Sequence, residues 1–307
     1  MLSRTLQKET AMSSRPTTRL RALLASHRAV MAPGVADPLF ARLVAVHGFD
    51  AMYMSGAGTS AVRLGMPDIG LLTLTEMADS VARIAAVSDL PLIADADNGF
   101  GGPMNVRRAV QEYERSGAAA MHIEDQVLPK RCGHLAGKQL IPTSEMVAKI
   151  KAALDARRDA DFIIIARTDA IAVEGYEAAL ERAERYKEAG ADMLFVEAPG
   201  PDQLAGINAR LAHPTLYNMA TSGKTPFLTR TEIEALGFKL IIYPNWMMLA
   251  AIRAASGVLE RLKADETIAG IAPEVPSFQQ FFDLLGMAEV RALEERYGVP
   301  EESRTGY

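Results

Sequence analysis

The stretches Phe162-Ile-Ile-Ile-Ala166 and Asp192-Met-Leu-Phe-Val-Glu197 decide the fold, because each is a short apolar run of the kind that forms a buried strand. Between them, small and apolar residues recur every three or four positions over residues 176–189, which indicates a helix. Gly190 follows and suits the left-handed end of that helix. The segment therefore predicts two parallel strands joined by a helix.

The same alternation extends in both directions along the 307-residue chain. Eight short apolar runs occupy residues 29–33, 51–54, 91–95, 119–124, 162–166, 192–197, 215–218 and 239–243. Each interval leaves room for one helix, so the pattern predicts an α/β fold of the (β/α)8 TIM-barrel type. In such barrels the catalytic groups gather at the carboxyl ends of the strands.

We expect three parts along the chain: an N-terminal arm over residues 1–19, a catalytic barrel over 20–262 and a helical extension over 263–307. The arm lacks a secretory apolar segment, although its Arg, Ser and Thr content leaves a transit peptide as an alternative. Aromatic pairs in the helical pattern over residues 278–297 are too apolar for free solvent. We expect the extension to dock against a partner subunit; the alternative is that it folds back on its own barrel.

The composition is typical of a soluble enzyme, with 49% hydrophobic and 23% charged residues. A net charge of -5 gives no basic surface for nucleic acid, and no apolar run is long enough to span a membrane. The single cysteine excludes an internal disulfide and favours a reducing compartment. We therefore expect a cytoplasmic protein that acts on small molecules.

Polar side chains end five of the predicted strands. They include Asp95, Asp97, Glu124, Arg167, Glu197 and Asn218. Asp95 and Asp97 are two residues apart and would face the same side of their strand, while Glu124 ends the next strand. A ring of carboxylates needs a cation, and hard oxygen ligands favour Mg²⁺ or Mn²⁺ over zinc. Arg167 would balance the charge and bind a carboxylate with its two-pronged guanidinium.

The loop Ser55-Gly56-Ala57-Gly58 follows the second strand and resembles a dinucleotide-binding loop. The acid that such a site needs about twenty residues later would fall within a helical pattern, so nucleotide binding is rejected. We instead expect backbone N–H groups of this loop to bind a carboxylate or a developing oxyanion.

Residues 128–138 follow the fourth strand and contain two glycines, which favour a mobile loop. Lys130, Arg131 and His134 surround the only cysteine, Cys132, with positive charge. This setting makes the thiol a candidate proton donor or nucleophile, the alternative being an inert buried thiol. Zinc is not expected, because no second Cys/His pair exists.

Four segments, in order at successive strand ends, resemble the isocitrate lyase/phosphoenolpyruvate mutase superfamily over about residues 20–255. They are Asp95-Ala-Asp97-Asn-Gly-Phe-Gly, His122-Ile-Glu124-Asp125-Gln126, Lys130-Arg-Cys-Gly-His134 and Ala166-Arg-Thr-Asp169. The third resembles the carbon–carbon lyase branch, which includes 2-methylisocitrate lyase, 2,3-dimethylmalate lyase and oxaloacetate hydrolase.

The resemblance implies a homotetramer, often with C-terminal helices exchanged between neighbouring subunits. It also implies Mg²⁺ near Asp97, with Asp68, Asp95 and Glu124 holding the ion partly through water. The substrate-binding candidates are Ser55, Gly56, Ala57, Gly133, Glu197 and Asn218. The catalytic candidates are Cys132, Arg167, Tyr53 and His134.

The implied reaction is retro-aldol cleavage of a 2-hydroxy di- or tricarboxylate to a 2-oxo acid, such as pyruvate, and a second carboxylate. Arg167 would polarise the C2 oxygen, Cys132 would protonate the carbanion, and Tyr53 is a candidate for the base or its relay. The alternatives are oxaloacetate hydrolysis to oxalate and acetate, phosphonate mutation, and carboxylate binding without catalysis. Two segments, residues 220–222 and 245–248, depart from the family pattern, which leaves the substrate open.

Overall fold

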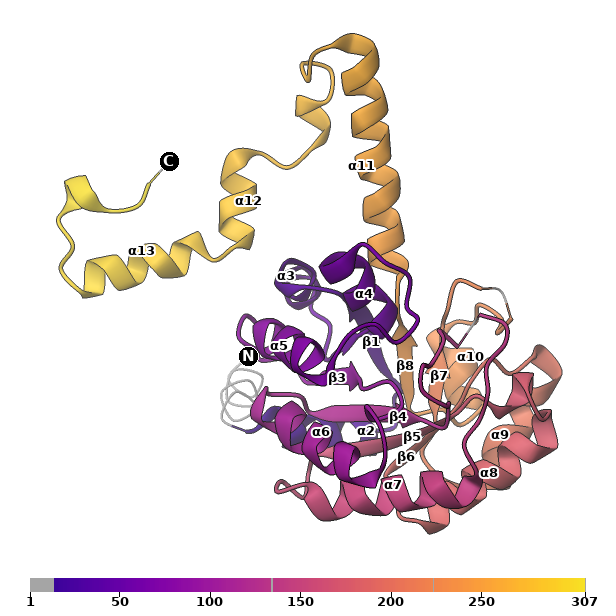
Figure 1. Ribbon diagram of the computed structural model, residues 1–307. Coiled ribbons are helices and arrows are strands. Elements are labelled where there is room, and N and C mark those ends of the chain that lie inside the picture. Colours follow the sequence, from indigo (N-terminus) through magenta and orange to yellow (C-terminus); the bar gives the residue numbers. More distant parts are fainter. Residues whose placement is uncertain (1–13, 134, 223, 307) are drawn as a thin grey trace. The chain divides into compact units, whose positions relative to one another are not determined.

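The computed structural model describes residues 14–133, 135–222 and 224–306. The chain forms two compact units, one extending to Met247 and one from Met248 onward. Within the described residues, the first unit is a barrel of eight parallel strands with helices between them (Figure 1). The predicted α/β barrel is therefore confirmed.

The strands lie where the apolar runs predicted them, within two residues at each end. They are Val30–Val35 (β1), Met52–Met54 (β2), Leu92–Asp95 (β3), Ala120–Glu124 (β4), Ile163–Thr168 (β5), Met193–Val196 (β6), Leu216–Asn218 (β7) and Leu240–Tyr243 (β8). Their order in the sheet is β6-β5-β4-β3-β2-β1-β8-β7. An isolated parallel bridge between Leu194 and Thr215 links the two edges, so the barrel is nearly closed.

Helices alternate with the strands along the barrel unit. They are Pro16–Ala25 (α2), Pro38–Val46 (α3), Gly56–Leu64 (α4), Leu74–Ala85 (α5), Pro103–Arg115 (α6), Thr143–Ala156 (α7), Tyr176–Glu188 (α8), Leu204–Leu211 (α9) and Arg230–Ala235 (α10), with short 3-10 turns at Ala170–Ala172 and Pro201–Gln203. Asp37, Ser55, Thr73 and Thr229 start four of them by accepting a backbone N–H in the first turn. No helix in the described residues is both long and apolar enough to cross a membrane.

Alternate residues along a strand face two different cores. Along β5, Ile163 and Ile165 lie in the core inside the barrel, whereas Ile164 packs in the core between strands and helices. Leu20 of α2 is fully buried in the inner core, and Arg21 donates a hydrogen bond to Asp192 at 2.9 Å. The helix α2 therefore packs against the amino-terminal end of the barrel.

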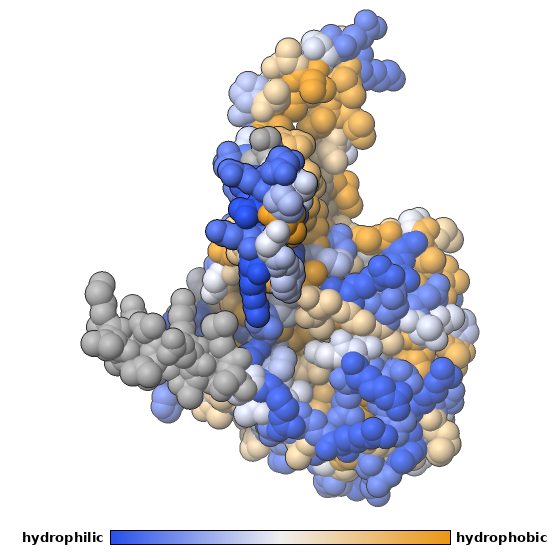
Figure 2. Space-filling model, turned by 90° about the vertical axis from the view of Figure 1, so that its left-hand side faces the viewer, coloured by the Kyte–Doolittle hydropathy of each residue, from blue (hydrophilic) through white to orange (hydrophobic). Residues whose placement is uncertain are grey.

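The second unit is helical. It contains most of Trp246–Asp265 (α11), then Ala272–Glu274, Phe278–Leu284 (α12), Met287–Arg296 (α13) and Glu301–Ser303. The predicted pattern over residues 278–297 is split at Gly286, whose φ of +91° favours glycine. Apolar side chains of α11 are exposed, including Ile252 and Leu259. Figure 2 shows orange, hydrophobic residues on the surface of this unit. Phe278 is also exposed, but exchange of these helices between subunits stays a prediction.

Candidate active site

A cavity of about 180 Å³ lies at the carboxyl ends of the strands. Its lining comes from the carboxyl ends of β2 to β8 and from loops between the strands. The lining residues are Tyr53, Ser55, Ala57, Asp68, Asp95, Glu124, Lys130, Cys132, Gly133, Arg167, Glu197, Asn218, Ala220, Thr221, Ser222, Pro244 and Asn245. Most of the catalytic, substrate-binding and metal-binding residues predicted from the sequence lie in this lining. Gly56 and Asp97 are not in this lining, and His134 lies outside the described residues.

Strand alternation explains why charged side chains point into the barrel. Ile93 and Phe195 belong to the inner core, and the residue two positions later is Asp95 or Glu197. The same step leads from Ile165 to Arg167. The inward-facing positions of these strands therefore carry apolar side chains inside the barrel and charged side chains at its carboxyl-terminal end.

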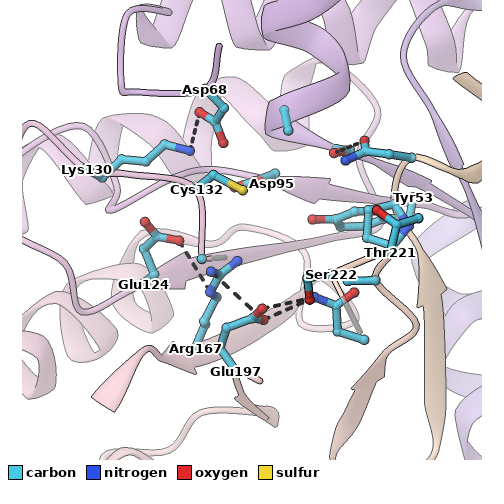
Figure 3. Close-up of a pocket in the computed structure, with 17 residues that line it drawn as sticks. Tyr53, Asp68, Asp95, Glu124, Lys130, Cys132, Arg167, Glu197, Thr221 and Ser222 are labelled. Carbon is cyan, nitrogen blue, oxygen red and sulfur yellow. Dashed lines mark hydrogen bonds and ion pairs between the residues drawn. The ribbon is translucent and has the colours of Figure 1, made fainter. Parts of the chain in front are cut away.

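Arg167 is held by three carboxylates. Its Nε donates to Asp169 Oδ2 at 2.9 Å and its Nη2 to Asp169 Oδ1 at 3.0 Å. Glu124 Oε2 lies 3.4 Å from the Nε and Glu197 Oε2 lies 3.9 Å from the Nη2. Dashed lines in Figure 3 mark both ion pairs. Burial disfavours the guanidinium charge, but these carboxylates outweigh it and raise the pKa of Arg167 well above its ordinary value. The site thus contains a permanently charged, oriented donor.

The acids predicted to bind a metal surround an ammonium group. Lys130 Nζ lies 2.5 Å from Asp68 Oδ1 and 2.6 Å from Asp97 Oδ1. Asp95 accepts the backbone N–H groups of Gly56 and Asp97 at 3.0 and 2.9 Å. Burial, with Asp95 and Asp68 nearby, raises the pKa of Asp97 to about 7 despite Lys130. The charges of these acids are therefore only partly compensated by the protein.

Glu124 provides the test of whether a cation fits. Its Oε1 is buried, and no residue that the structure describes donates a hydrogen bond to it. Burial raises the pKa of Glu124 well above its usual range, with Asp169 and Asp95 adding to the shift and Arg167 opposing it. In the described part of the chain, no three His, Cys, Asp or Glu side chains are arranged to hold a metal directly. An all-oxygen set with one unpartnered oxygen fits Mg²⁺ bound partly through water.

Cys132 is carried by a loop that lies against Arg167. The N–H of Cys132 donates to the carbonyl of Asp68 at 3.1 Å. At Gly133, an added Cβ would lie 2.1 Å from Arg167 Nη2, so a side chain there would displace the guanidinium. Gln126 fixes the loop further, since its side chain both accepts from and donates to the backbone of Arg131. The loop thus places Cys132 on the cavity wall and the adjacent Gly133 against the guanidinium.

Tyr53 is paired with a histidine that sequence reasoning did not select. The Tyr53 hydroxyl lies 2.9 Å from His122 Nε2, and both side chains are buried. Burial raises the pKa of Tyr53, helped by Asp95, and lowers the pKa of His122 to about 4. His122 precedes Glu124 by two residues and therefore shares its inward direction, a signal that was present in the sequence.

Two N–H groups of the segment after β2 already have acceptors within the protein. The N–H of Gly58 donates to Ser55 Oγ at 3.2 Å, and Ser55 Oγ in turn donates to Asn245 Oδ1 at 3.1 Å. The N–H of Gly56 is taken by Asp95. Ser55 and Ala57 line the cavity. Their predicted contact with a substrate carboxylate stays a prediction.

The part of the wall that follows β7 and β8 has small, uncharged side chains. It comprises Ala220, Thr221, Ser222, Pro244 and Asn245. Asn218 Nδ2 donates to Glu197 at 3.2 Å and turns that acid toward β7. Trp246 is not in the lining; its Nε1 donates to the carbonyl of Met219 at 2.7 Å.

The family is decided by comparison with known proteins. A family model described as phosphoenolpyruvate phosphomutase matches residues 20–263. The chain belongs to this family. It is 45% identical over 280 residues to 2,3-dimethylmalate lyase of Eubacterium barkeri, covering 91% of this chain and 97% of the relative. It is 44% identical over 301 residues to 2-methylisocitrate lyase of Aeropyrum pernix, covering 95% and 97%.

Solved structures agree with this assignment. A 2,3-dimethylmalate lyase of the PEP mutase/isocitrate lyase superfamily superposes with a TM-score of 0.90 at 39% identity, covering 96% of this chain and 99% of that one. Oxaloacetate acetylhydrolase bound to 3,3-difluorooxalacetate gives 0.88 at 36%, covering 93% and 98%. Phosphonopyruvate hydrolase with oxalate and Mg²⁺ gives 0.85 at 33%, covering 92% and 99%. The predictions of this superfamily and of an enzyme are confirmed.

Proposed function

We propose that this protein is a Mg²⁺-dependent carbon–carbon lyase that cleaves a 2-hydroxy di- or tricarboxylate to a 2-oxo acid and a second carboxylate. The observation that carries the proposal is the meeting of Arg167, the buried acids and Cys132 on one cavity. The names of its relatives, 2,3-dimethylmalate lyase and 2-methylisocitrate lyase, support the same reaction class.

The carboxylates supply the metal site in this proposal. Asp95, Asp97, Glu124 and Asp68 would hold Mg²⁺, partly through water, with Mn²⁺ as an alternative ion. When bound, the ion would polarise the C2 oxygen of the substrate and neutralise the surrounding acids. The Mg²⁺ in the structure of phosphonopyruvate hydrolase supports this assignment.

The remaining groups divide the proton transfers and the binding. Arg167, held in one orientation by Asp169, binds the 2-oxo acid end of the substrate through charge-assisted hydrogen bonds. Tyr53 lies at the cavity with its hydroxyl on His122 and takes or relays the substrate hydroxyl proton. Cys132 delivers a proton to the carbanion left by cleavage, and the loop around it keeps water from that carbanion.

Two groups of residues complete the substrate site in this proposal. Ser55, Gly56 and Ala57 bind the 2-oxo acid end together with Gly133, beside Arg167. Glu197 and Asn218, joined to each other, lie next to the uncharged wall and bind the distal half. His134 stays a catalytic candidate on its position in the sequence.

A product assay tests the proposal. Purified protein is incubated with 2-methylisocitrate, isocitrate, 2,3-dimethylmalate or oxaloacetate, each with Mg²⁺ and with EDTA. Pyruvate or glyoxylate formed from a hydroxy acid only with Mg²⁺ is the expected result. No 2-oxo acid from any of the three hydroxy acids would overturn the lyase assignment.

Oxaloacetate hydrolysis is the second candidate, favoured by the similarity to oxaloacetate acetylhydrolase. In that reaction the products are oxalate and acetate, so the same assay separates the two reactions. Oxalate from oxaloacetate, without cleavage of the hydroxy acids, would assign the protein to this class.

We also propose that the subunits form a homotetramer in which C-terminal helices are exchanged. The exposed aromatic side chains of α12, Phe278 and Phe281, support a partner that covers them. Light scattering of the full chain and of a Phe278→Asp variant tests this: a tetramer that dissociates in the variant is expected, and a monomeric wild type would refute it.

A further inference from the structure

Lys138 joins the loop that carries Cys132 to the end of β5. Its Nζ donates to the carbonyl oxygen of Gly133 at 2.5 Å and to Asp169 Oδ1 at 2.8 Å. Its side chain is only 2% exposed, and Lys138 is not among the residues that line the cavity. We propose that Lys138 is a positioning residue, which fixes the Cys132–Gly133 backbone against the guanidinium of Arg167.

The shared partner of the two cations is Asp169. Its Oδ1 accepts from both Lys138 Nζ and Arg167 Nη2, while its Oδ2 accepts from Arg167 Nε. One fully buried carboxylate therefore orients the guanidinium and the ammonium together. An unbroken path of hydrogen bonds runs from the Gly133 carbonyl through Lys138 and Asp169 to Arg167.

Direct packing reinforces this path. A Cβ on Gly133 would lie 2.1 Å from Arg167 Nη2 and 3.1 Å from Asp169 Oδ1, so the loop backbone lies directly on the charged pair. A displacement of the Gly133 peptide changes the space available to the guanidinium. Because Cys132 is the preceding residue, the same displacement moves the thiol relative to Arg167.

The other attachments of this loop reach a different side of the cavity. Lys130 contacts Asp68 and Asp97, and the N–H of Cys132 donates to the Asp68 carbonyl. Lys138 attaches the loop to the arginine side. Removing the ammonium leaves those first attachments in place, and Asp169 still pairs with Arg167, so no isolated charge is created. We therefore expect Lys138→Met to fold and to disturb the loop locally.

The role of this positioning in catalysis rests on the proposed lyase reaction, but the test does not depend on that reaction. Cys132 is the only cysteine of the chain, so its alkylation rate with iodoacetamide reports on the loop alone. The rate is measured on the full-length protein for wild type, Lys138→Met and Lys138→Arg. Lys187→Met is the matched control, since Lys187 Nζ also donates to a backbone carbonyl, that of Leu211 at 2.6 Å.

The expected result is a change of alkylation rate by about fivefold or more in Lys138→Met, because exposure and electrostatic setting control thiol reactivity. With an active substrate, kcat should fall about 10²-fold with little change in KM, as expected when a reacting group is displaced. Lys138→Arg keeps a charged group that can donate to both acceptors. Its alkylation rate and its kcat should therefore return most of the way to the wild-type values. The Lys187→Met control should match wild type in both measurements.

An unchanged alkylation rate in folded Lys138→Met would overturn the proposal, whatever happens to turnover. If the methionine variant does not fold, Lys138→Gln decides in its place, since its shorter, uncharged side chain cannot join the Gly133 carbonyl to Asp169 as the ammonium does. If the wild type cleaves no hydroxy acid and Lys138→Met still changes the alkylation rate, the positioning role stands and the lyase assignment fails.

Discussion

Arg167 and Asp169, two residues apart at the end of β5, are joined by two hydrogen bonds of 2.9 and 3.0 Å that lock the guanidinium plane. A fork of this kind supplies direction as well as charge. The geometry makes the arginine a fixed donor on the cavity wall before any ligand arrives.

The first prediction concerns this fork. Arg167→Lys keeps the charge but loses the bidentate geometry, and we expect kcat/KM to fall about 10²-fold or more. Steady-state kinetics with the active hydroxy acid measure the loss. Arg210→Lys is the control, because Arg210 forms a similar fork with Glu184 on the outer surface. Equal activity of Arg167→Lys and wild type would exclude a role for the fork.

The second prediction concerns the thiol. Cys132→Ser should lower kcat by about 10² to 10⁴-fold, the usual contribution of a positioned general acid. Ligand binding should survive, because Arg167 and the acids are unchanged. Stopped-flow turnover and calorimetric binding of oxalate with Mg²⁺ measure the two effects. Turnover close to that of wild type would remove Cys132 from the mechanism.

The third prediction concerns the metal. Glu124→Gln removes one buried carboxylate whose Oε1 has no donor among the described residues. We expect Mg²⁺ affinity, measured by calorimetry without substrate, to fall about 10 to 100-fold. Glu145→Gln is the control, since Glu145 lies in the first turn of α7. Wild-type affinity in Glu124→Gln would place the ion elsewhere.

The fourth prediction concerns pH. Burial lowers the pKa of His122 from 6.5 to about 4. As pH falls below about 6.5, the unfolded chain binds a proton here and the folded protein does not, so stability falls toward pH 4. Between pH 7.5 and pH 5, wild type should lose about 2 kcal/mol more unfolding free energy than His122→Asn. Urea titrations in EDTA measure both proteins; equal losses would mean that folded His122 is protonated.

The fifth prediction concerns the amino-terminal end of the barrel. Leu20 is fully buried in the inner core, so Leu20→Ala should cost about 2 to 5 kcal/mol of unfolding free energy. Leu39→Ala, in the first turn of α3 and 39% exposed, should cost much less. Chemical denaturation compares the two variants. Similar small costs would mean that α2 is not part of the cooperative core.

Much of this architecture follows from local sequence. The strands were predictable because a buried strand is a short apolar run, and Arg167 and Glu197 could be placed because strand alternation carries them inward. The pairing of Lys138 with Asp169 was not predictable, since it depends on how one loop folds over a neighbouring strand end. Lys130 was expected to supply positive charge near Cys132, and its contact with Asp68 and Asp97 required three-dimensional structure.

The continuous helix expected over residues 278–297 fails for a definite reason. Gly286 adopts a left-handed conformation that interrupts the helical backbone hydrogen bonds, although the apolar spacing on either side is helical. Apolar spacing indicates which face of a helix is buried, but it does not indicate where the helix ends.

The cavity wall has a charged arc and an uncharged arc, and the two differ in how many contacts a single substitution would disturb. The charged arc is interlocked, since Asp169 is shared by two cations and Lys130 by two acids, so a single change there disturbs several neighbours. The arc of Ala220, Thr221 and Ser222 is made of small neutral side chains from one loop. A substitution in that loop would therefore reshape the cavity while leaving the contacts of the charged arc in place.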